Sequence, residues 1–414
     1  MKTRSSPDLL LLLLALLCAH NSAVRADDDA APAPALAGVA SPAASWALGA
    51  WSGARTHLAQ RGLDMEFLAT TDVLGVVAGG RERALEAPSR FDMIFKLDTN
   101  TANWWQSGSF QLALMGTAGG SVSAHAGDLQ IVSNVDGPST FIVYEATYEH
   151  RFLNDRVSVL AGLHNLNTEF YVLENSGIFL NSSFGIGIEL SQVGTSIFPV
   201  TAPGIRLQVN WTPDTYFLVA LFDGAPGSAQ SSFGTHVGFD RGDGVFAIAE
   251  TGMLGAQAAY YKVGIGGWYH THEFTDLANR TRDDNAGVYA VAERDLWRRE
   301  DGRGMGMFAQ LGFAEADRNQ VATYAGGGVT WTGPLAARPA DVAGLAVAHA
   351  RNGNRFRRFN PGTERAETTI EASYLTHPLP WLTVQPDLQY VINPSTDSSI
   401  DNALVIGLRL QATF

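Results

Sequence analysis

Apolar and polar residues alternate along the C-terminal residues 402–414. One face would carry Leu404, Ile406, Leu408, Leu410, Ala412 and Phe414, and the other Val405, Gly407, Arg409, Gln411 and Thr413. Successive side chains of a β-strand point to opposite faces, so a period of two predicts a strand. The same period recurs over residues 91–97, 204–211 and 381–392. The pattern therefore predicts β-strands from residue 63 to the last residue.

The alternation divides this part of the chain into sixteen predicted strands. They span residues 63–70, 91–97, 109–116, 141–150, 157–164, 204–211, 215–223, 245–250, 256–270, 286–293, 304–314, 322–332, 341–350, 366–376, 381–392 and 402–414. An even number of antiparallel strands is typical of single-chain barrels of bacterial outer membranes.

The connections between these strands differ in length in a regular way. Residues 212–214, 251–255 and 377–380 are short connections, whereas residues 71–90, 117–140, 165–203, 224–244 and 351–365 are long ones. In outer-membrane barrels the short turns face the periplasm and the longer loops face the outside. The order of short and long connections predicts that both ends of the barrel chain lie on the periplasmic side.

The character of the two faces favours a membrane barrel over a soluble sandwich. The polar faces carry bulky charged residues such as Arg206, whereas the apolar faces are long and flanked by aromatic residues. An apolar face toward lipid and a polar face toward a wet interior account for both features. Phe414, at the end of the last strand, fits an interfacial aromatic girdle. We therefore predict an all-β fold, a transmembrane antiparallel β-barrel of sixteen strands that is wide enough for an aqueous channel.

Composition supports this class of protein. The 414 residues include 28 Lys and Arg against 41 Asp and Glu, which gives a net charge of −13. Charged residues make up 17% of the chain, below the roughly 25% of soluble domains. The acidic balance argues against a nucleic-acid-binding protein, which would need a basic face. The single cysteine, Cys18, excludes a disulfide framework and a cysteine-based zinc site.

Three segments are predicted before the barrel. A basic start, a short apolar run and a small-residue exit indicate a secretory signal peptide over residues 1–26. Residues 27–45 are rich in Ala and Pro and predict a flexible linker. Residues 46–62 carry an apolar stripe at helical spacing, which predicts a short helix at the periplasmic mouth. The barrel would then occupy residues 63–414.

The connection over residues 165–203 is the longest, with 39 residues, and it is not uniformly polar. Its apolar residues are Phe170, Tyr171, Ile178, Phe179, Phe184, Ile186, Ile197 and Phe198. A loop that remains in solvent does not need so many apolar groups. We therefore expect this loop to fold inward and to narrow the channel.

Several ordered motifs resemble those of the carbohydrate-selective porin family, the OprB-type porins. They are Gly162–Phe170 (GLHNLNTEF), Phe179–Gly185 (FLNSSFG), Ser196–Pro199 (SIFP), Ala202–Leu207 (APGIRL) and Pro380–Pro394 (PWLTVQPDLQYVINP). Weaker likeness begins near Trp51, so the resemblance covers about residues 46–414. It implies a sixteen-stranded outer-membrane barrel through which sugars diffuse. His164 and Asn165 stand where the family tends to have Tyr and Asp, which removes an acidic group near the expected constriction.

The candidate constriction residues have polar side chains on or near the inward loop. Arg206 lies on the polar face of strand 204–211, directly after the loop, and Glu169 lies at the start of the loop. Lys96 and Glu145 occupy the polar faces of earlier strands, so opposed charges would create a transverse field across the gap. An arginine fork can also bond pairs of sugar hydroxyls. Alternatively, Arg206 only ties the loop to the wall through a carboxylate.

Asn167 and Asn181 lie in the same connection. Their amide groups could exchange with water for the hydroxyl groups of a passing sugar, so they complete the predicted set of pore-lining residues.

The leading functional hypothesis is a passive channel for small neutral sugars in the outer membrane, with no catalysis, no cofactor and no metal. A general porin for small hydrophilic or acidic solutes is one alternative, and a barrel enzyme that hydrolyses lipids is another. No Gly-x-Ser-x-Gly motif is present. The arginines of loop 351–365 would contact lipopolysaccharide or attract acidic solutes. The sequence leaves open whether the barrel forms a homo-oligomer.

Overall fold

The computed structural model describes residues 46–227, 242–255, 259–282 and 284–414. The predicted signal peptide and linker lie outside the described residues. Within the described ranges, no helix is both long enough and apolar enough to cross a membrane.

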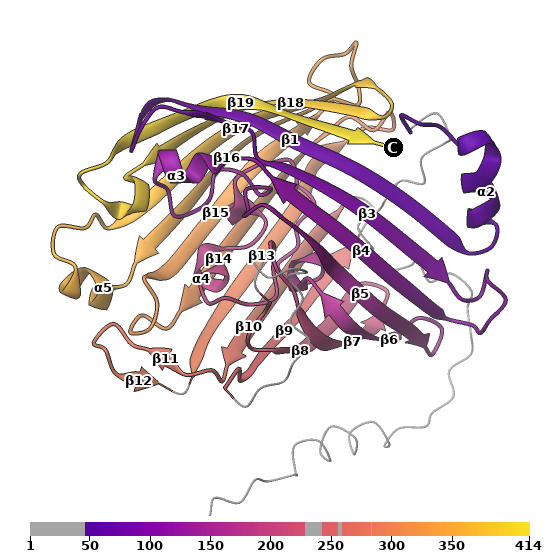
Figure 1. Cartoon of the computed structure of the whole chain (residues 1–414), viewed down its shortest axis with the longest axis horizontal. Helices are drawn as coiled ribbons and strands as arrows, with labels where there is room; N and C mark the ends of the chain where they lie inside the picture. The colour runs from indigo at the N-terminus through magenta and orange to yellow at the C-terminus, as the bar shows by residue number, and fades with distance from the viewer. Residues whose placement is uncertain (1–45, 228–241, 256–258, 283) are drawn as a thin grey trace, which may run out of the picture. The chain divides into compact units, whose positions relative to one another are not determined.

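Sixteen antiparallel strands form a closed barrel, as predicted (Figure 1). They are β1 (Leu63–Gly80), β3 (Ser89–Asp98), β4 (Gly108–Ala118), β5 (Thr140–Phe152), β6 (Val157–His164), β7 (Ala202–Thr212), β8 (Thr215–Asp223), β9 (Val245–Gly255), β10 (Tyr261–His270), β13 (Asn285–Arg298), β14 (Gly304–Ala314), β15 (Val321–Thr332), β16 (Val342–Asn352), β17 (Ala366–Leu379), β18 (Leu382–Ile392) and β19 (Asp401–Thr413). Each strand pairs with the next along the chain. The barrel closes where β1 pairs with β19, with Asp72 opposite Arg409.

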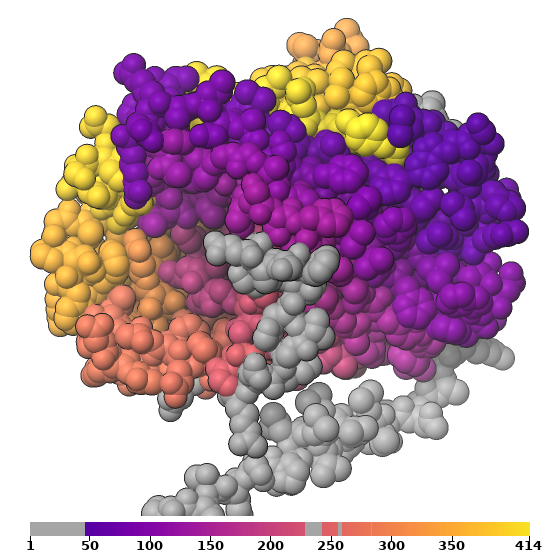
Figure 2. Space-filling view, viewed as in Figure 1, coloured from indigo at the N-terminus to yellow at the C-terminus, as the bar shows by residue number. Residues whose placement is uncertain are grey.

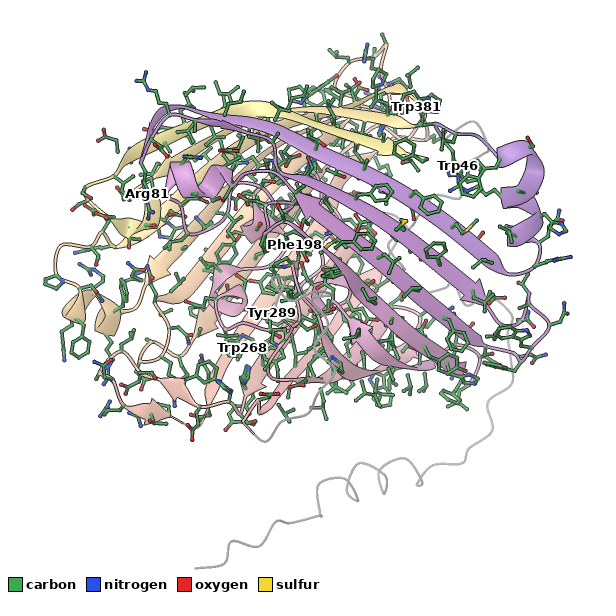
Figure 3. All side chains as sticks on the ribbon, viewed as in Figure 1. Trp46, Arg81, Phe198, Trp268, Tyr289 and Trp381 are labelled. Atoms are coloured by element: carbon green, nitrogen blue, oxygen red, sulfur yellow. The ribbon has the colours of Figure 1, made fainter. Side chains whose placement is uncertain are left out.

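Short elements decorate the connections. The two-residue strand β2 (Leu85–Glu86) adds to β1, and β11 (Phe274–Thr275) pairs with β12 (Thr281–Arg282) in a separate hairpin. The connecting helices are α3 (Val122–Ala126), η3 (Leu166–Thr168), η4 (Ser182–Phe184), α4 (Ile188–Ser191), α5 (Asn354–Phe359) and η5 (Pro394–Thr396). The long connections gather at the end of the barrel where Arg81 lies, and Trp46 lies at the other end (Figure 3).

Three strands end five or more residues later than the alternation predicts: β1, β9 and β13, the last of which continues to Arg298 rather than to residue 293. β1 continues to Gly80 rather than to residue 70, because Leu74 and Val76 on its inner face are buried by the loop that carries α3. Both faces of this part of the strand are therefore apolar, and the period of two disappears. β9 continues to Gly255 rather than to residue 250. The inward position Gly252 in this extension has no side chain because the Tyr216 ring occupies the space.

The outer face of the barrel is apolar and carries aromatic residues at both ends. Half-exposed Trp105, Trp211, Trp297 and Trp331 surround the end with the short turns, and Phe141, Tyr269, Phe313 and Tyr390 surround the end with the long loops. Two such girdles are the mark of a barrel that spans a bilayer. In the space-filling view the first strands of the chain form a continuous outer wall (Figure 2).

Part of the barrel interior is a packed hydrophobic core. Phe170, Tyr171, Phe179, Phe184 and Leu190 of the connection between β6 and β7 pack against inward side chains of β8 to β16. Those strands present small residues at many inward positions, among them Gly306, Gly312, Gly344, Ala346 and Ala348. Small inner residues leave space for the loop. In this packing the loop turns inward, over residues 165–201.

The N-terminal helical segment is shorter than predicted. The 3-10 turn η2 (Trp51–Gly53) and the helix α2 (Ala54–Ala59) together cover half of the expected 46–62. Arg55 of α2 is 4% exposed and donates hydrogen bonds to the carbonyl oxygens of Met65 and Phe414, at 2.6 and 2.8 Å. Its guanidinium lies over the rings of Trp46 and Trp51. The helix is therefore fastened to the β1–β19 seam.

Candidate functional site: the inward loop and the constriction

The inward loop has little regular secondary structure, so its backbone N–H groups need other acceptors. Glutamates that project inward from the wall accept these hydrogen bonds. Glu145 of β5 accepts from the N–H of Asn165 at 3.1 Å, and Glu250 of β9 accepts from the N–H of Tyr171 at 2.9 Å. These carboxylates fasten the first half of the loop to the barrel.

Two further glutamates hold the second half. Glu293 of β13 accepts from the N–H groups of Glu174 and Asn175, at 3.0 and 2.8 Å. Glu371 of β17 accepts from the N–H groups of Leu180 and Asn181, at 2.5 and 3.0 Å. Each carboxylate thus binds two successive amides of the loop.

Wall amides and hydroxyls complete the attachment by donating to loop carbonyls. Gln310 donates to Phe184 O at 2.9 Å, Gln385 to Ile178 O at 2.5 Å, and Tyr324 to Ser183 O at 2.7 Å. Lys262 of β10 donates to Val172 O at 2.7 Å. The loop is therefore fixed along its whole length by side chains of β5, β9, β10, β13 to β15, β17 and β18.

Arg206 lies in an ion-pair cluster at the base of the loop. Its guanidinium contacts Glu169 at 2.5 Å and Glu149 of β5 at 3.0 Å, and it donates to Ser158 of β6. Arg206 is only 2% exposed. His164 is also buried and lies 3.7 Å from Glu169. These contacts match the predicted alternative in which Arg206 ties the loop to the wall.

The remaining predicted residues occupy two kinds of position. Asn167 donates to Phe170 O at 3.1 Å and to Gly185 O at 2.9 Å, so it braces the loop. Asn181 is fully buried and caps η4 by accepting from the N–H of Ser183.

Lys96 differs from these residues, because its side chain is exposed on the inner face of β3 opposite Asp64 and Gln111. Lys96 and Glu145 therefore do not face each other across the narrow part of the channel. Glu145 is instead held by Gln111, which donates to it at 2.6 Å.

A second loop, residues 119–139, enters the barrel from the side of β1 and β19. Arg409 pairs with Asp72 at 2.6 Å and donates to the side-chain oxygen of Asn134 at 2.6 Å. Ser133 donates to the same aspartate at 2.7 Å. Glu367 of β17 accepts from the N–H groups of residues 129 and 130. The channel is therefore narrowed from two directions, by two loops held in the same manner.

Arg90 was not identified from the sequence, although it combines features expected of a sugar contact. It pairs with Asp92 at 2.8 Å on the inner face of β3, and 22% of its side chain remains exposed. Its guanidinium lies 5.1 Å from the Tyr144 ring and 5.2 Å from the Phe198 ring. The Arg-x-Asp spacing on a strand with a clear apolar face was the available signal. The aromatic partners come from β5 and the inward loop, so their proximity depends on the fold.

Two buried acids of the loops have raised pKa values. Burial of Glu189 in α4 raises its pKa to about 7, although Tyr171 donates a hydrogen bond to it at 3.0 Å. Burial also raises the pKa of Asp128 to about 6, and the like charge of Asp136 adds to the shift. Both groups hold their protons more strongly than exposed acids do, because a charge in a packed interior lacks solvation.

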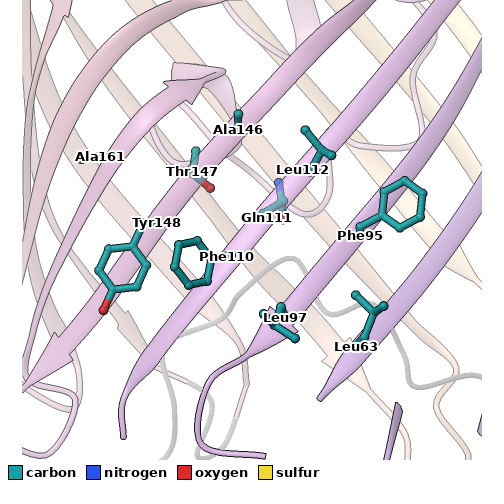
Figure 4. A pocket seen from close by; sticks show the side chains of 10 residues that line it. All are labelled: Leu63, Phe95, Leu97, Phe110, Gln111, Leu112, Ala146, Thr147, Tyr148 and Ala161. Atoms are coloured by element: carbon teal, nitrogen blue, oxygen red, sulfur yellow. The ribbon is translucent and has the colours of Figure 1, made fainter. Parts of the chain in front are cut away.

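The chemistry of the described residues is that of a channel wall. Among them, no group of three or more His, Cys, Asp or Glu side chains is arranged to hold a metal ion. A cleft of about 450 Å³ lies outside the channel, because Phe95, Phe110, Leu112 and Tyr148 around it belong to the outer face (Figure 4).

A sixteen-stranded barrel with two aromatic girdles and an inward-folded loop is an outer-membrane porin. A family model described as "Carbohydrate-selective porin, OprB family" matches residues 82–414. The chain belongs to this family, as the sequence motifs suggested.

Known relatives agree with this assignment. The chain is 24% identical to Porin B of Pseudomonas aeruginosa, over 90% of this chain and 92% of that protein. It resembles the high-pH structure of Pseudomonas putida OprB with a TM-score of 0.84 and 22% identity, over 90% of this chain and 99% of that one. The low-pH structure of the same protein gives a TM-score of 0.62 and 20% identity, over 90% and 100%.

The protein is therefore an outer-membrane porin for the passive diffusion of sugars, as predicted, and it acts as a channel rather than as an enzyme. Of the alternatives that the sequence left open, the lipid hydrolase is excluded by this membership.

Proposed function

We propose that sugars pass through the space that the two inward loops leave next to β3, β4 and β5, and that Arg90 is the main group they contact. The partly exposed side chain of Arg90, with its guanidinium held between Asp92 and two aromatic rings, is the observation that carries this proposal. A planar fork bonds neighbouring hydroxyls of a sugar, and an aromatic face accepts its C–H surface. Such contacts must stay weak, because tight binding would stop permeation.

The six residues selected from the sequence then divide into two roles. Lys96, with its exposed side chain, lines the wide part of the channel. Arg206, Glu169, Glu145, Asn167 and Asn181 set the width of the constriction by holding the loop. In this proposal they affect selectivity through the position of the loop rather than by touching the sugar.

The test is the block of ion current by a neutral monosaccharide in planar bilayers. Arg90→Ala removes hydrogen bonds to a charged donor, each of which contributes about 1.5–3 kcal/mol. The sugar concentration for half-block should therefore rise about tenfold or more. Arg156→Ala, in the exposed turn between β5 and β6, is the matched control and should behave as the parent. An Arg90→Ala channel with unchanged sugar block would remove Arg90 from the path.

The orientation and processing of the chain belong to the same proposal. The end with the long loops faces the outside and the end with α2 faces the periplasm, with residues 1–26 removed on export. The arrangement of short and long connections supports this orientation. The proposal also includes contact between the barrel and lipopolysaccharide. Assembly into a homo-oligomer stays a prediction, which cross-linking of the folded barrel can test.

A further inference from the structure

Loop 353–365 and the end of β16 carry four arginines without ionic partners. Among the residues that the structure describes, no carboxylate lies within 4.0 Å of the guanidinium of Arg351, Arg357, Arg358 or Arg365. Arg355 differs, because it lies 3.7 Å from Asp276 and 3.7 Å from Asp317. In a protein of net charge −13, arginines at one place that lack an ionic partner among the described residues call for a partner from outside the chain.

Arg351 belongs to the outer face of the barrel. On β16 the inward residues Ala346, Ala348 and Ala350 are buried in the core against the inward loop. The opposite face carries Leu345 and Val347, which are 53% and 42% exposed, followed by His349 and Arg351. Arg351 therefore stands at the upper end of a lipid-facing apolar column. A long cationic side chain at this level extends toward the headgroups.

Helix α5 begins two residues after the last residue of β16 and lies next to the β11–β12 hairpin (Figure 1). It carries Arg357 and Arg358 beside Phe359, which is 50% exposed. The Nε atom of Arg357 is buried without a hydrogen-bond partner among the described residues. Exposed aromatic and cationic side chains on one short helix are typical of a segment at a membrane interface.

From these observations we propose that Arg351, Arg357 and Arg358 form a binding site for the phosphate groups of lipopolysaccharide, the glycolipid of the outer leaflet. The inference rests on the proposed orientation and adds the residues that contact the lipid. Guanidinium groups bind phosphate oxygens in a bidentate manner. Arg351 faces away from the lumen, so the site serves a lipid of the bilayer and not an acidic solute on its way through the channel.

The first experiment measures the thermal unfolding midpoint of the folded full-length barrel in neutral detergent as purified lipopolysaccharide is added. The parent should be stabilised. The triple variant Arg351→Gln/Arg357→Gln/Arg358→Gln should need roughly a hundredfold more glycolipid for the same shift, at about fivefold per arginine. The control Arg61→Gln/Arg156→Gln/Arg294→Gln changes the charge equally at the opposite end of the barrel and should match the parent. An equal glycolipid requirement in the triple variant and the parent would overturn the site.

Two further probes separate the sources of phosphate. Dephosphorylated glycolipid should not stabilise the parent, and inorganic phosphate at the same concentration should not either. A full effect of either probe would contradict the proposal. If the triple variant does not fold, the single change Arg358→Gln, at an exposed side chain, gives the same comparison. Sugar flux through the folded variants should stay unchanged. A loss of flux together with the expected loss of glycolipid binding would count against the proposed sugar path alone.

Discussion

Arg206 shows why the surroundings of a residue decide its role. Its position on the polar face after the longest loop favours a pore-lining arginine, yet its guanidinium is buried between Glu149, Glu169 and Ser158. A buried cation that pairs with two carboxylates can hold a loop in place. If the cation or a carboxylate is removed, the remaining buried charges lack compensation, which is costly. The residue controls the channel through the loop that it fixes.

Arg206→Ala should therefore loosen the loop rather than remove a charge from the path. The cost should lie near the lower end of the roughly 3–5 kcal/mol for breaking a buried pair, because Glu149 and Glu169 keep 17% and 19% of their side chains exposed. Single-channel recordings should show more current noise with little change in ion selectivity. A quiet, wider channel with a clear shift toward cations would instead place Arg206 on the path.

At the scale of elements, the long loops are tied to one another as well as to the wall. His125 of α3 lies 2.7 Å from Glu82 and 2.9 Å from Glu86, one carboxylate at each ring nitrogen. Both nitrogens donate only when the imidazole is protonated. The hydrogen bond to Glu86, followed by that to Glu82, raises the pKa of His125 above its usual 6.5. These two hydrogen bonds form a His125 clasp. The clasp joins the loop after β1 to loop 119–139, which Asp72 and Arg409 anchor.

The clasp should weaken as the pH rises. Because the folded-state pKa of His125 is raised, its stabilisation is complete below pH 6.5 and is lost as the pH passes through the higher folded value. Amide hydrogen exchange of residues 81–87 should therefore accelerate, relative to the intrinsic rate, between slightly acid and alkaline pH. Arg81, whose N–H donates to the carbonyl oxygen of His125, should report the opening directly. In His125→Gln the protection should be low at every pH, and a pH-dependent loss that persists in this variant would contradict the mechanism.

At the scale of the whole molecule, the barrel could be predicted because its outer face meets one solvent everywhere. Lipid imposes an apolar residue at every second position, so all sixteen strands were recognised. The prediction of strand length was wrong at β1, where a loop buries the inner face and the alternation stops at Leu74 and Val76.

The attachment of the loop could not be predicted from residue types. Glu250, Glu293 and Glu371 resemble ordinary pore-lining acids in the sequence, and only the path of the loop shows that they accept its backbone N–H groups. Arg90 was missed because Tyr144 and Phe198, which define its environment, come from distant parts of the chain. Strand periodicity carries no information about such partners.

The central claim is that two fixed inward loops leave a passage that favours neutral sugars. Liposome swelling with the purified barrel tests it most directly, using a monosaccharide, a disaccharide and a charged amino acid of monosaccharide size at equal osmolarity. We predict fast swelling with the monosaccharide, and clearly slower swelling with the disaccharide and with the charged solute. Equal rates for the neutral and the charged solute of the same size would show an unselective pore and would contradict the account.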